Sequence, residues 1–261
     1  MHIIKRKTEF NISGKYSVDW FVPNIHYGNW EEDTFNILDH YQNPDKTYID
    51  IGAWIGPTVL YSASKFKNVV CFEPDPVAVE RLYENLSVNN FNNITLINKA
   101  LGNANTITEF GGNGELGNSM STMLVGLNNK EDFFNNYGVD NGFLSYEQRK
   151  SNIIVVETIT IETVLKTHYI DPDNIGLIKM DIEGGEIVVI PAISHFLRTY
   201  KPTFYISLHR VFLKESDINY ILSILFNIYN DCYYIDGNNN KIKIDMKTIQ
   251  MYNLTSMIFE K

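Results

Sequence analysis

A glycine-rich loop follows the first strongly apolar run of the chain, and its residues suit a ligand with a polar end. Asp50, Gly52 and Gly56 belong to the segment YIDIGAWIG, and a helix-like sequence follows at once. Glycine has no Cβ to block a close approach between ligand and backbone. The free N–H groups at the start of a helix attract a carboxylate. The segment therefore predicts a ligand-binding loop against a helix N-terminus.

An acidic residue, Glu73, lies 23 residues after Asp50, at the end of the next apolar run. In nucleotide-binding α/β folds, an acid about 20 residues after the glycine loop holds the ribose hydroxyls. A dinucleotide loop needs Gly-x-Gly-x-x-Gly, but counted from Gly52 the third position is Trp54 and the sixth is Pro57. A ligand that carries an ammonium and a sulfonium needs a carboxylate near the loop, which Asp50 supplies. The pattern therefore favours S-adenosylmethionine over NAD.

Charged residues gather near the end of another apolar segment, LIKMDIEGG. Alternation places Lys179, Asp181 and Glu183 on one face of the predicted strand. A central parallel strand is normally apolar on both faces, so charges here need an explanation. His209 ends the next predicted strand, and ligands of open α/β sheets bind beyond the carboxyl ends of the strands. We expect an active site here; a structural Lys–carboxylate ion pair and a surface histidine are the alternatives.

Strand-like and helix-like segments alternate from residue 47 onward, which predicts βαβ units and a parallel sheet. Residues 1–46 are expected to form an N-terminal cap before one domain over 47–261. Residues 102–150 interrupt the alternation as a loop-rich insertion, either a lid or a surface excursion. We expect the last two strands to form an antiparallel hairpin at one edge. The expected strands are 48–52, 69–73, 94–101, 153–160, 175–182, 202–208, 232–235 and 256–259, and the expected helices 33–41, 57–65, 76–89, 162–167, 186–197 and 217–229.

Composition argues against several classes of function. The net charge is −9, which disfavours a nucleic-acid partner because phosphate neutralisation supplies most of such affinity. No apolar stretch reaches the ~18 residues of a transmembrane helix, and the N-terminus lacks the apolar run of a secretory signal. We therefore expect a cytoplasmic protein without a membrane span. Cys71 and Cys232 lie in apolar runs and are expected to be buried thiols.

The segments DIGAWIG, FEPDP, NKALG and LIKMDIEGGE occur in the order and spacing of the FkbM family of methyltransferases. The chain resembles that family over residues 47–210, and LIKMDIEGGE is the most specific segment. The resemblance implies a class I methyltransferase fold: a Rossmann-like, doubly wound, seven-stranded α/β sheet with the last strand antiparallel and helices on both faces. It also implies S-adenosylmethionine as cofactor and O-methylation of a hydroxyl, often in a sugar of a glycan, glycolipid or glycosylated metabolite.

The resemblance also assigns residues to the cofactor. The family often has Asn where this chain has Trp54, so the loop departs from the pattern there. Residues 125–150 match poorly and are a candidate region for substrate choice. The residues implied are Asp50, Gly52 and Gly56 for the methionine end, with Trp54 in the same loop, Glu73 for the ribose, Ala100 near the adenine and Glu31, in the weakly similar segment GNWE, for the amino group.

For the reaction, we expect the acceptor hydroxyl to attack the sulfonium methyl while Asp181 or His209 takes its proton, with Glu183 and Lys179 in support. Alternatively, a divalent metal bound to Asp181, Glu183 or His209 acidifies the hydroxyl. The sequence leaves metal dependence open. Competing functions are methylation of a non-sugar small molecule or a protein, a nicotinamide-dependent dehydrogenase, and a non-catalytic cofactor-binding protein.

Overall fold

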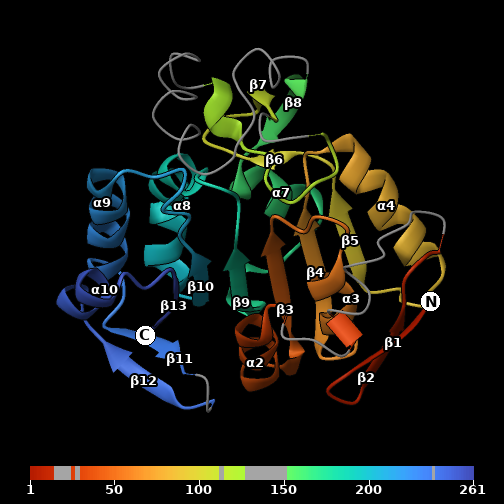
Figure 1. Cartoon of the computed structure of the whole chain (residues 1–261), viewed down its shortest axis with the longest axis horizontal. Helices are drawn as coiled ribbons and strands as arrows, with labels where there is room; N and C mark the ends of the chain where they lie inside the picture. The colour runs from red at the N-terminus through yellow and green to blue at the C-terminus, as the bar shows by residue number, and fades with distance from the viewer. Residues whose placement is uncertain (15–24, 27–29, 112–114, 127–151, 237–238) are drawn as a thin grey trace.

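The computed structural model describes residues 1–14, 25–26, 30–111, 115–126, 152–236 and 239–261. An eight-stranded sheet forms the middle of the molecule (Figure 1). Its strands are β3 (Asn43–Ile51), β4 (Phe66–Phe72), β5 (Ile94–Ile97), β9 (Ile175–Met180), β10 (Thr203–Ser207), β11 (Asp231–Ile235), β12 (Lys241–Ile244) and β13 (Ser256–Glu260).

The strand order is β12-β11-β13-β10-β9-β3-β4-β5. The strands β10, β9, β3, β4 and β5 are parallel, and the last strand, β13, is antiparallel to both of its neighbours. The chain runs outward from β3 to β5 and then returns to β9 on the other side of β3. This reversal confirms the doubly wound α/β sheet and the antiparallel last strand.

Two details of the predicted sheet are wrong. The sheet has eight strands, because Lys241–Ile244 pairs antiparallel with β11 as an additional edge strand. The two strands expected as the edge hairpin, β11 and β13, do pair antiparallel, but β13 lies between β10 and β11 and not at the edge of the sheet. Its position is explained by burial, because the apolar side chains of Met257, Ile258 and Phe259 are all fully buried. The edge hairpin consists of β11 and β12 instead.

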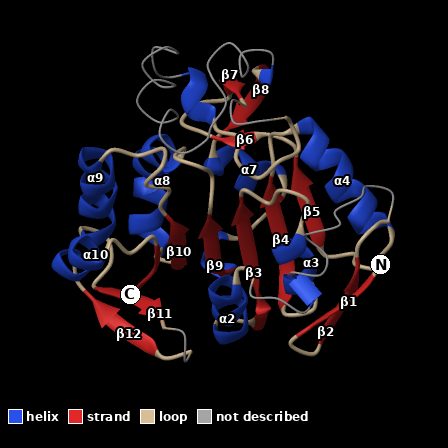
Figure 2. Cartoon of the chain, viewed as in Figure 1, coloured by secondary structure: helices blue, strands red, loops and turns tan. Residues whose placement is uncertain are grey.

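Helices cover both faces of the sheet, as predicted (Figure 2). Consecutive strand residues alternate between two apolar clusters. Tyr48 packs with α2 and α3, whereas Ile49 belongs to the cluster that contains α8 and α9. The helices of the first cluster are α2 (Glu32–His40), α3 (Pro57–Ser62) and α4 (Pro76–Ser87), and those of the second are α7 (Ile161–Thr167), α8 (Glu186–Tyr200), α9 (Glu215–Phe226) and α10 (Met246–Tyr252).

A small three-stranded sheet lies beyond the carboxyl ends of the central strands, at the top of Figure 1. It contains β6 (Ala100–Leu101), β8 (Ile154–Ile159) and β7 (Thr106–Phe110) in that order. The strand expected over 94–101 is therefore two strands in different sheets. The chain turns between them, where the Lys99 N–H donates to the Ile97 carbonyl (2.8 Å).

The described part of the predicted insertion is also more regular than expected. It contains β7 and the 3-10 helix η1 (Met123–Gly126), while residues 127–151 lie outside the described residues. At the N-terminus, β1 (His2–Lys5) and β2 (Thr8–Asn11) form an antiparallel hairpin, and η3 (Pro172–Asn174) precedes β9. The two cysteines are free and buried, as predicted. None of the helices in the described ranges has the length and apolarity needed to cross a bilayer.

Candidate active site

A cavity lies at the carboxyl ends of β3, β4 and β9, where the strand order reverses. Ligands of open α/β sheets bind at this switch point. The cavity encloses about 1060 Å³, counting the open space at its mouth. The predicted site residues on its wall are Glu31, Gly52, Trp54, Glu73, Ala100, Lys179, Asp181, Glu183 and His209.

The two glycines of the loop after β3 are required by the chain itself. Gly52 and Gly56 have φ values of +91° and +89°, a region that other residues rarely adopt. A Cβ on Gly52 would lie 1.9 Å from the carbonyl oxygen of Asp181, and one on Gly56 would lie 2.2 Å from Cδ1 of Leu82. Gly52 lines the cavity, but Gly56 does not. The turn and the packing of the loop therefore require both glycines, and their role toward a ligand stays a prediction.

Asp50 lies behind the wall of the cavity rather than on it. Its side chain is fully buried and accepts a hydrogen bond from Thr58 Oγ1 (2.5 Å). The Lys179 ammonium lies 3.4 Å from its other oxygen. These two partners separate Asp50 from the cavity, because both Thr58 and Lys179 line it. The direct contact with the methionine end expected for Asp50 is therefore not part of this geometry.

Glu73 follows β4 and is held rigidly by backbone groups. One carboxylate oxygen accepts from the Trp54 N–H (2.7 Å) and the other from the Asp75 N–H (2.8 Å). Each oxygen keeps a second lone pair for a ligand hydroxyl. Burial raises the pKa of Glu73 to about 7. The strand-end position expected for a ribose-binding acid is thus present.

Asp75 is a residue of this site that the sequence reasoning missed. It caps α4 by accepting from the N–H groups of Val77 and Ala78. Its second oxygen accepts from the Gly117 N–H (2.6 Å), and the Trp54 indole donates to the Gly117 carbonyl (2.8 Å). The segment near Gly117 is thereby tied to the cavity wall. The capping pattern Asp-Pro was the available signal, but the long-range contact leaves no trace in the sequence.

Three residues of the wall have strained backbones. Glu31, Trp54 and Glu183 have φ values of 46°, 49° and 53°, in the left-handed region that few non-glycine residues occupy. Asn is enriched in that region, so Trp54 is a more strained choice there than Asn. Such strain concentrates at functional sites. The grouping of three such residues around one cavity therefore supports its functional role.

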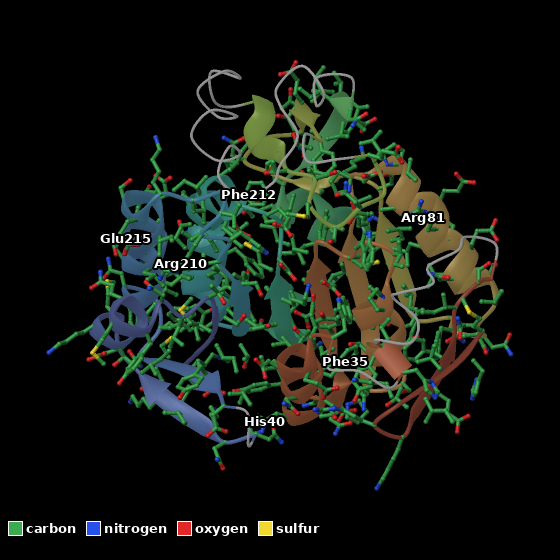
Figure 3. The ribbon with its side chains drawn as sticks, viewed as in Figure 1. Phe35, His40, Arg81, Arg210, Phe212 and Glu215 are labelled. Carbon is green, nitrogen blue, oxygen red and sulfur yellow. The ribbon has the colours of Figure 1, made fainter. Side chains whose placement is uncertain are left out.

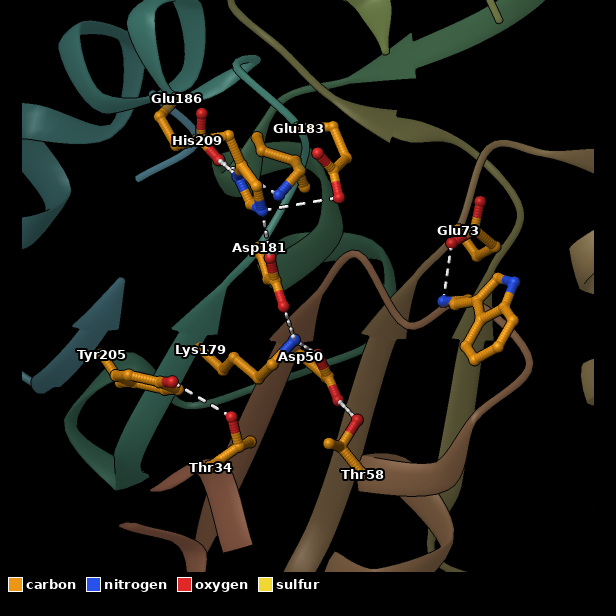
Figure 4. Close-up of polar contacts among 12 residues, drawn as sticks. Thr34, Asp50, Thr58, Glu73, Lys179, Asp181, Glu183, Glu186, Tyr205 and His209 are labelled. Atoms are coloured by element: carbon orange, nitrogen blue, oxygen red, sulfur yellow. Dashed lines mark hydrogen bonds and ion pairs between the residues drawn. The ribbon is translucent and has the colours of Figure 1, made fainter. Parts of the chain in front are cut away.

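Three carboxylates of the segment after β9 converge on the imidazole of His209, which follows β10 (Figure 4). Nε2 of His209 lies 3.1 Å from Asp181 Oδ1 and 3.4 Å from Glu183 Oε1. Nδ1 lies 3.3 Å from Oε1 of Glu186, whose side chain is fully buried. Glu186 was not among the predicted residues, although it belongs to the segment LIKMDIEGGE.

The Lys179 ammonium links Asp50 to this group, because it also lies 3.2 Å from Asp181 Oδ2. Burial alone would raise the pKa of Asp181, but Lys179 and His209 hold it well below its usual range. Burial would lower the pKa of His209, but hydrogen bonds to Asp181 and Glu186 outweigh it and raise that pKa to about 11. Burial raises the pKa of Glu183 to about 8. The Lys–carboxylate ion pair considered above is thus present, whereas His209 is not a surface histidine but a half-buried member of the same connected group.

Arg210 follows His209 but contacts a different partner. Its Nη1 lies 2.9 Å from Oε2 of Glu215, at the start of α9 (Figure 3). A second cavity lies beside the first and shares Glu31, Asp181 and His209 with it. Most of its other wall residues carry a carboxylate or a hydroxyl, namely Glu32, Asp33, Thr34, Tyr205, Ser207, Thr255 and Ser256, and the rest are Leu208, Arg210 and Val211.

Comparison with known proteins agrees with the resemblance found in the sequence. The family model described as the methyltransferase FkbM domain matches residues 50–235. A ribosomal protein L11 methyltransferase of Clostridium perfringens (strain SM101 / Type A) is 36% identical over 95 residues, which are 34% of this chain. The match spans only 30% of the length of that relative.

Two solved methyltransferase structures match this chain at low sequence identity. The methyltransferase FkbM of Methylobacillus flagellatus KT shares 17% identity at a TM-score of 0.45, covering 83% of this chain and 44% of that one. The precorrin-6y C5,15-methyltransferase of Geobacter metallireducens GS-15 shares 11% identity at a TM-score of 0.44, covering 97% and 95%.

Proposed function

This chain belongs to the FkbM family of S-adenosylmethionine-dependent methyltransferases, and on that premise we propose that it methylates a hydroxyl group of a sugar-containing acceptor. The observation that carries the proposal is the pair of adjoining cavities. One has residues expected for the cofactor, the other has several carboxylate and hydroxyl side chains on its wall, and Asp181 and His209 line both.

The residues of the first cavity fit S-adenosylmethionine. The Glu73 carboxylate is placed to accept from the ribose hydroxyls, and Ala100 lies in the apolar part of the wall expected for the adenine. Glu31, the residue expected to bind the amino group, lines the same cavity as Gly52 and Trp54. When bound, this cofactor supplies an electrophilic methyl group on a sulfonium. Asp50 and Gly56 act from behind the wall, by holding Lys179 and by shaping the loop.

The second cavity favours a sugar as acceptor. Sugars present several hydroxyls close together, and carboxylates and hydroxyl side chains can accept and donate the matching hydrogen bonds. Asp33, Ser207 and Thr255 supply such groups at different points of the wall. An acceptor hydroxyl at the border would lie next to Asp181 and His209. Positioning it there in near-attack geometry can supply about 7–11 kcal/mol of the barrier reduction.

In this proposal Asp181, His209, Glu183 and Lys179 form the catalytic group. The acceptor oxygen contacts Asp181 and His209, while Lys179 keeps Asp181 ionised and Glu183 flanks the imidazole. The O–H bond and the bond from sulfur to methyl break, and the O–CH₃ bond forms. The proton leaves either directly to Asp181 or from a hydroxyl acidified on a divalent ion.

The experiment is a methyl-transfer assay with radiolabelled S-adenosylmethionine and three acceptor classes: glycosides, small non-sugar alcohols, and ribosomal protein L11. Ribosomal protein L11 is included because part of this chain matches L11 methyltransferases, which makes L11 the specific alternative acceptor. We expect label in glycosides as a methyl ether, which resists mild alkali, unlike a methyl ester. Label in L11 alone would refute the sugar proposal and support protein methylation.

Asp181→Asn keeps the shape of the side chain and is expected to abolish transfer while binding of S-adenosylhomocysteine persists. Glu162→Gln, an exposed acid on α7, is the control. A variant Asp181→Asn with normal turnover would remove this residue from the catalytic group. The absence of a nucleic-acid partner and the cytoplasmic location remain predictions from composition.

A further inference from the structure

The geometry points to a divalent cation bound by Asp181 Oδ1, Glu183 Oε1 and His209 Nε2, at the border of the two cavities. These ligand atoms all lie within 4.8 Å of one another. An ion with bonds of about 2.1 Å holds neighbouring ligands about 3.0 Å apart and opposite ligands about 4.2 Å apart. The separations of 3.1 Å and 3.4 Å from Nε2 need little adjustment to match.

The surrounding residues orient each ligand for this role. Glu186 lies behind the imidazole, with its carboxylate 3.3 Å from Nδ1, so that Nε2 faces Asp181 and Glu183 (Figure 4). Metal-binding histidines almost always donate their other ring N–H to a carboxylate, a backbone carbonyl or a water, which fixes the orientation of the ring. Lys179 contacts Oδ2 of Asp181, which leaves Oδ1 for the ion. The Ile182 N–H donates a hydrogen bond to Oε1 of Glu186 (3.1 Å), which fixes the Glu186 carboxylate behind the imidazole.

Charge and burial supply an independent observation. Glu186 is fully buried, and its Oε2 has no hydrogen-bond partner within the described residues. Together with Asp181 and Glu183, it places three carboxylates around His209, and Lys179 is the one lysine on the wall of the first cavity as described. A buried negative charge is costly unless it is paired or coordinates a metal. A divalent ion at Nε2 would displace the proton of His209 and put two positive charges beside these carboxylates, in place of the one that the protonated imidazole carries.

Three protein ligands leave positions open for an acceptor hydroxyl, as in catalytic rather than structural metal sites. The pairing of one imidazole with two carboxylates suits Mn²⁺ or Zn²⁺ more than Ca²⁺. The pKa of a hydroxyl falls when it binds the ion, so the acceptor can lose its proton to solvent. The inference deepens the proposed function and rests on it for this role, but binding of the ion can be measured without an acceptor.

The test is a titration of the chelator-treated protein with Mn²⁺, in which electron paramagnetic resonance counts the free ion. We expect one bound Mn²⁺ per chain. The affinity should fall at least tenfold in His209→Gln, which removes a ligand, and about 10–100-fold in Glu186→Gln, which changes only the carboxylate behind that ligand. His195→Gln, an exposed histidine on α8, is the matched control and should bind as wild type does. Circular dichroism verifies that each variant is folded.

A spectroscopic readout separates this site from adventitious carboxylate binding. Electron spin-echo modulation of bound Mn²⁺ should show coupling to an imidazole nitrogen in wild type and His195→Gln, and none in His209→Gln. If Mn²⁺ does not bind, or binds without that coupling, the proposed metal site is wrong and His209 belongs only to a group of ion pairs. Calorimetry with S-adenosylhomocysteine is run in parallel. If the protein binds S-adenosylhomocysteine but does not bind Mn²⁺, the metal site is refuted and the proposed function stands. If it binds Mn²⁺ but does not bind S-adenosylhomocysteine, the proposed function is refuted.

Discussion

Replacing Lys179 by methionine tests whether the buried charges beneath the cavity are stabilised by mutual pairing. The ammonium lies between Asp50 and Asp181, and the Lys179 and Asp50 side chains are 3% and 0% exposed. Methionine preserves most of the side-chain volume but leaves the carboxylate of Asp50 buried without its cation. Removing one partner of a buried pair typically costs about 3–5 kcal/mol. At roughly 2–4 °C per kcal/mol for a chain of this size, the midpoint of thermal unfolding should fall by about 6–20 °C.

Urea unfolding of Lys179→Met, of Asp50→Asn, of the double variant Asp50→Asn/Lys179→Met and of Lys99→Met measures this effect. Lys99 pairs with Glu157 at the surface, where the side chains are 38% and 61% exposed. The same substitution there should cost less than about 1 kcal/mol. The double variant should be more stable than the sum of its single changes by about 0.5–3 kcal/mol. Equal losses in Lys179→Met and Lys99→Met would refute the reasoning.

Three further predictions concern the same framework. Gly52→Ala should lower the free energy of unfolding by about 2 kcal/mol or more, because of its positive φ and the 1.9 Å approach of a Cβ to backbone, whereas Gly14→Ala, with open space around it, should stay within about 0.5 kcal/mol; equal urea midpoints would contradict this. Asp75→Ala should cost about 0.5–2 kcal/mol through loss of the α4 cap and weaken S-adenosylhomocysteine binding by releasing Gly117; unchanged affinity in calorimetry would show that the Gly117 contact is irrelevant to the cofactor. Asn85→Ala should cost about 1–3 kcal/mol, because its buried amide joins two backbone segments, and a smaller loss in urea would mean that water replaces it.

The general architecture was accessible from the sequence because it depends on local patterns. Apolar runs of strand length, separated by helical segments, indicated the parallel sheet, and Gly52 and Glu73 at the ends of such runs indicated the switch point. The proximity of Asp181 and His209 followed from the same rule, because parallel strands end at one edge of the sheet. These features need only the period of the pattern and the direction of the strands.

The remaining features depend on contacts between distant segments. Alternation placed Glu183 on an extended strand, but β9 ends at Met180 and Glu183 adopts a left-handed turn. That turn brings Glu186 to His209, which no strand pattern predicts. Asp50 appeared available to a ligand, yet Thr58 and Lys179 satisfy it from two other elements. The division of 94–101 between two sheets likewise depends on pairing with β8, which is more than 50 residues away along the chain.

Calorimetric titration with S-adenosylhomocysteine, with NAD as a control ligand, tests the central claim most directly. Trp54 and Asp75 hold the Glu73 carboxylate where the ribose is expected. The account predicts micromolar binding of S-adenosylhomocysteine, lost in Glu73→Ala and retained in Glu162→Ala, and no binding of NAD. Binding of NAD without binding of S-adenosylhomocysteine would contradict the assignment of this cavity to the methyl donor.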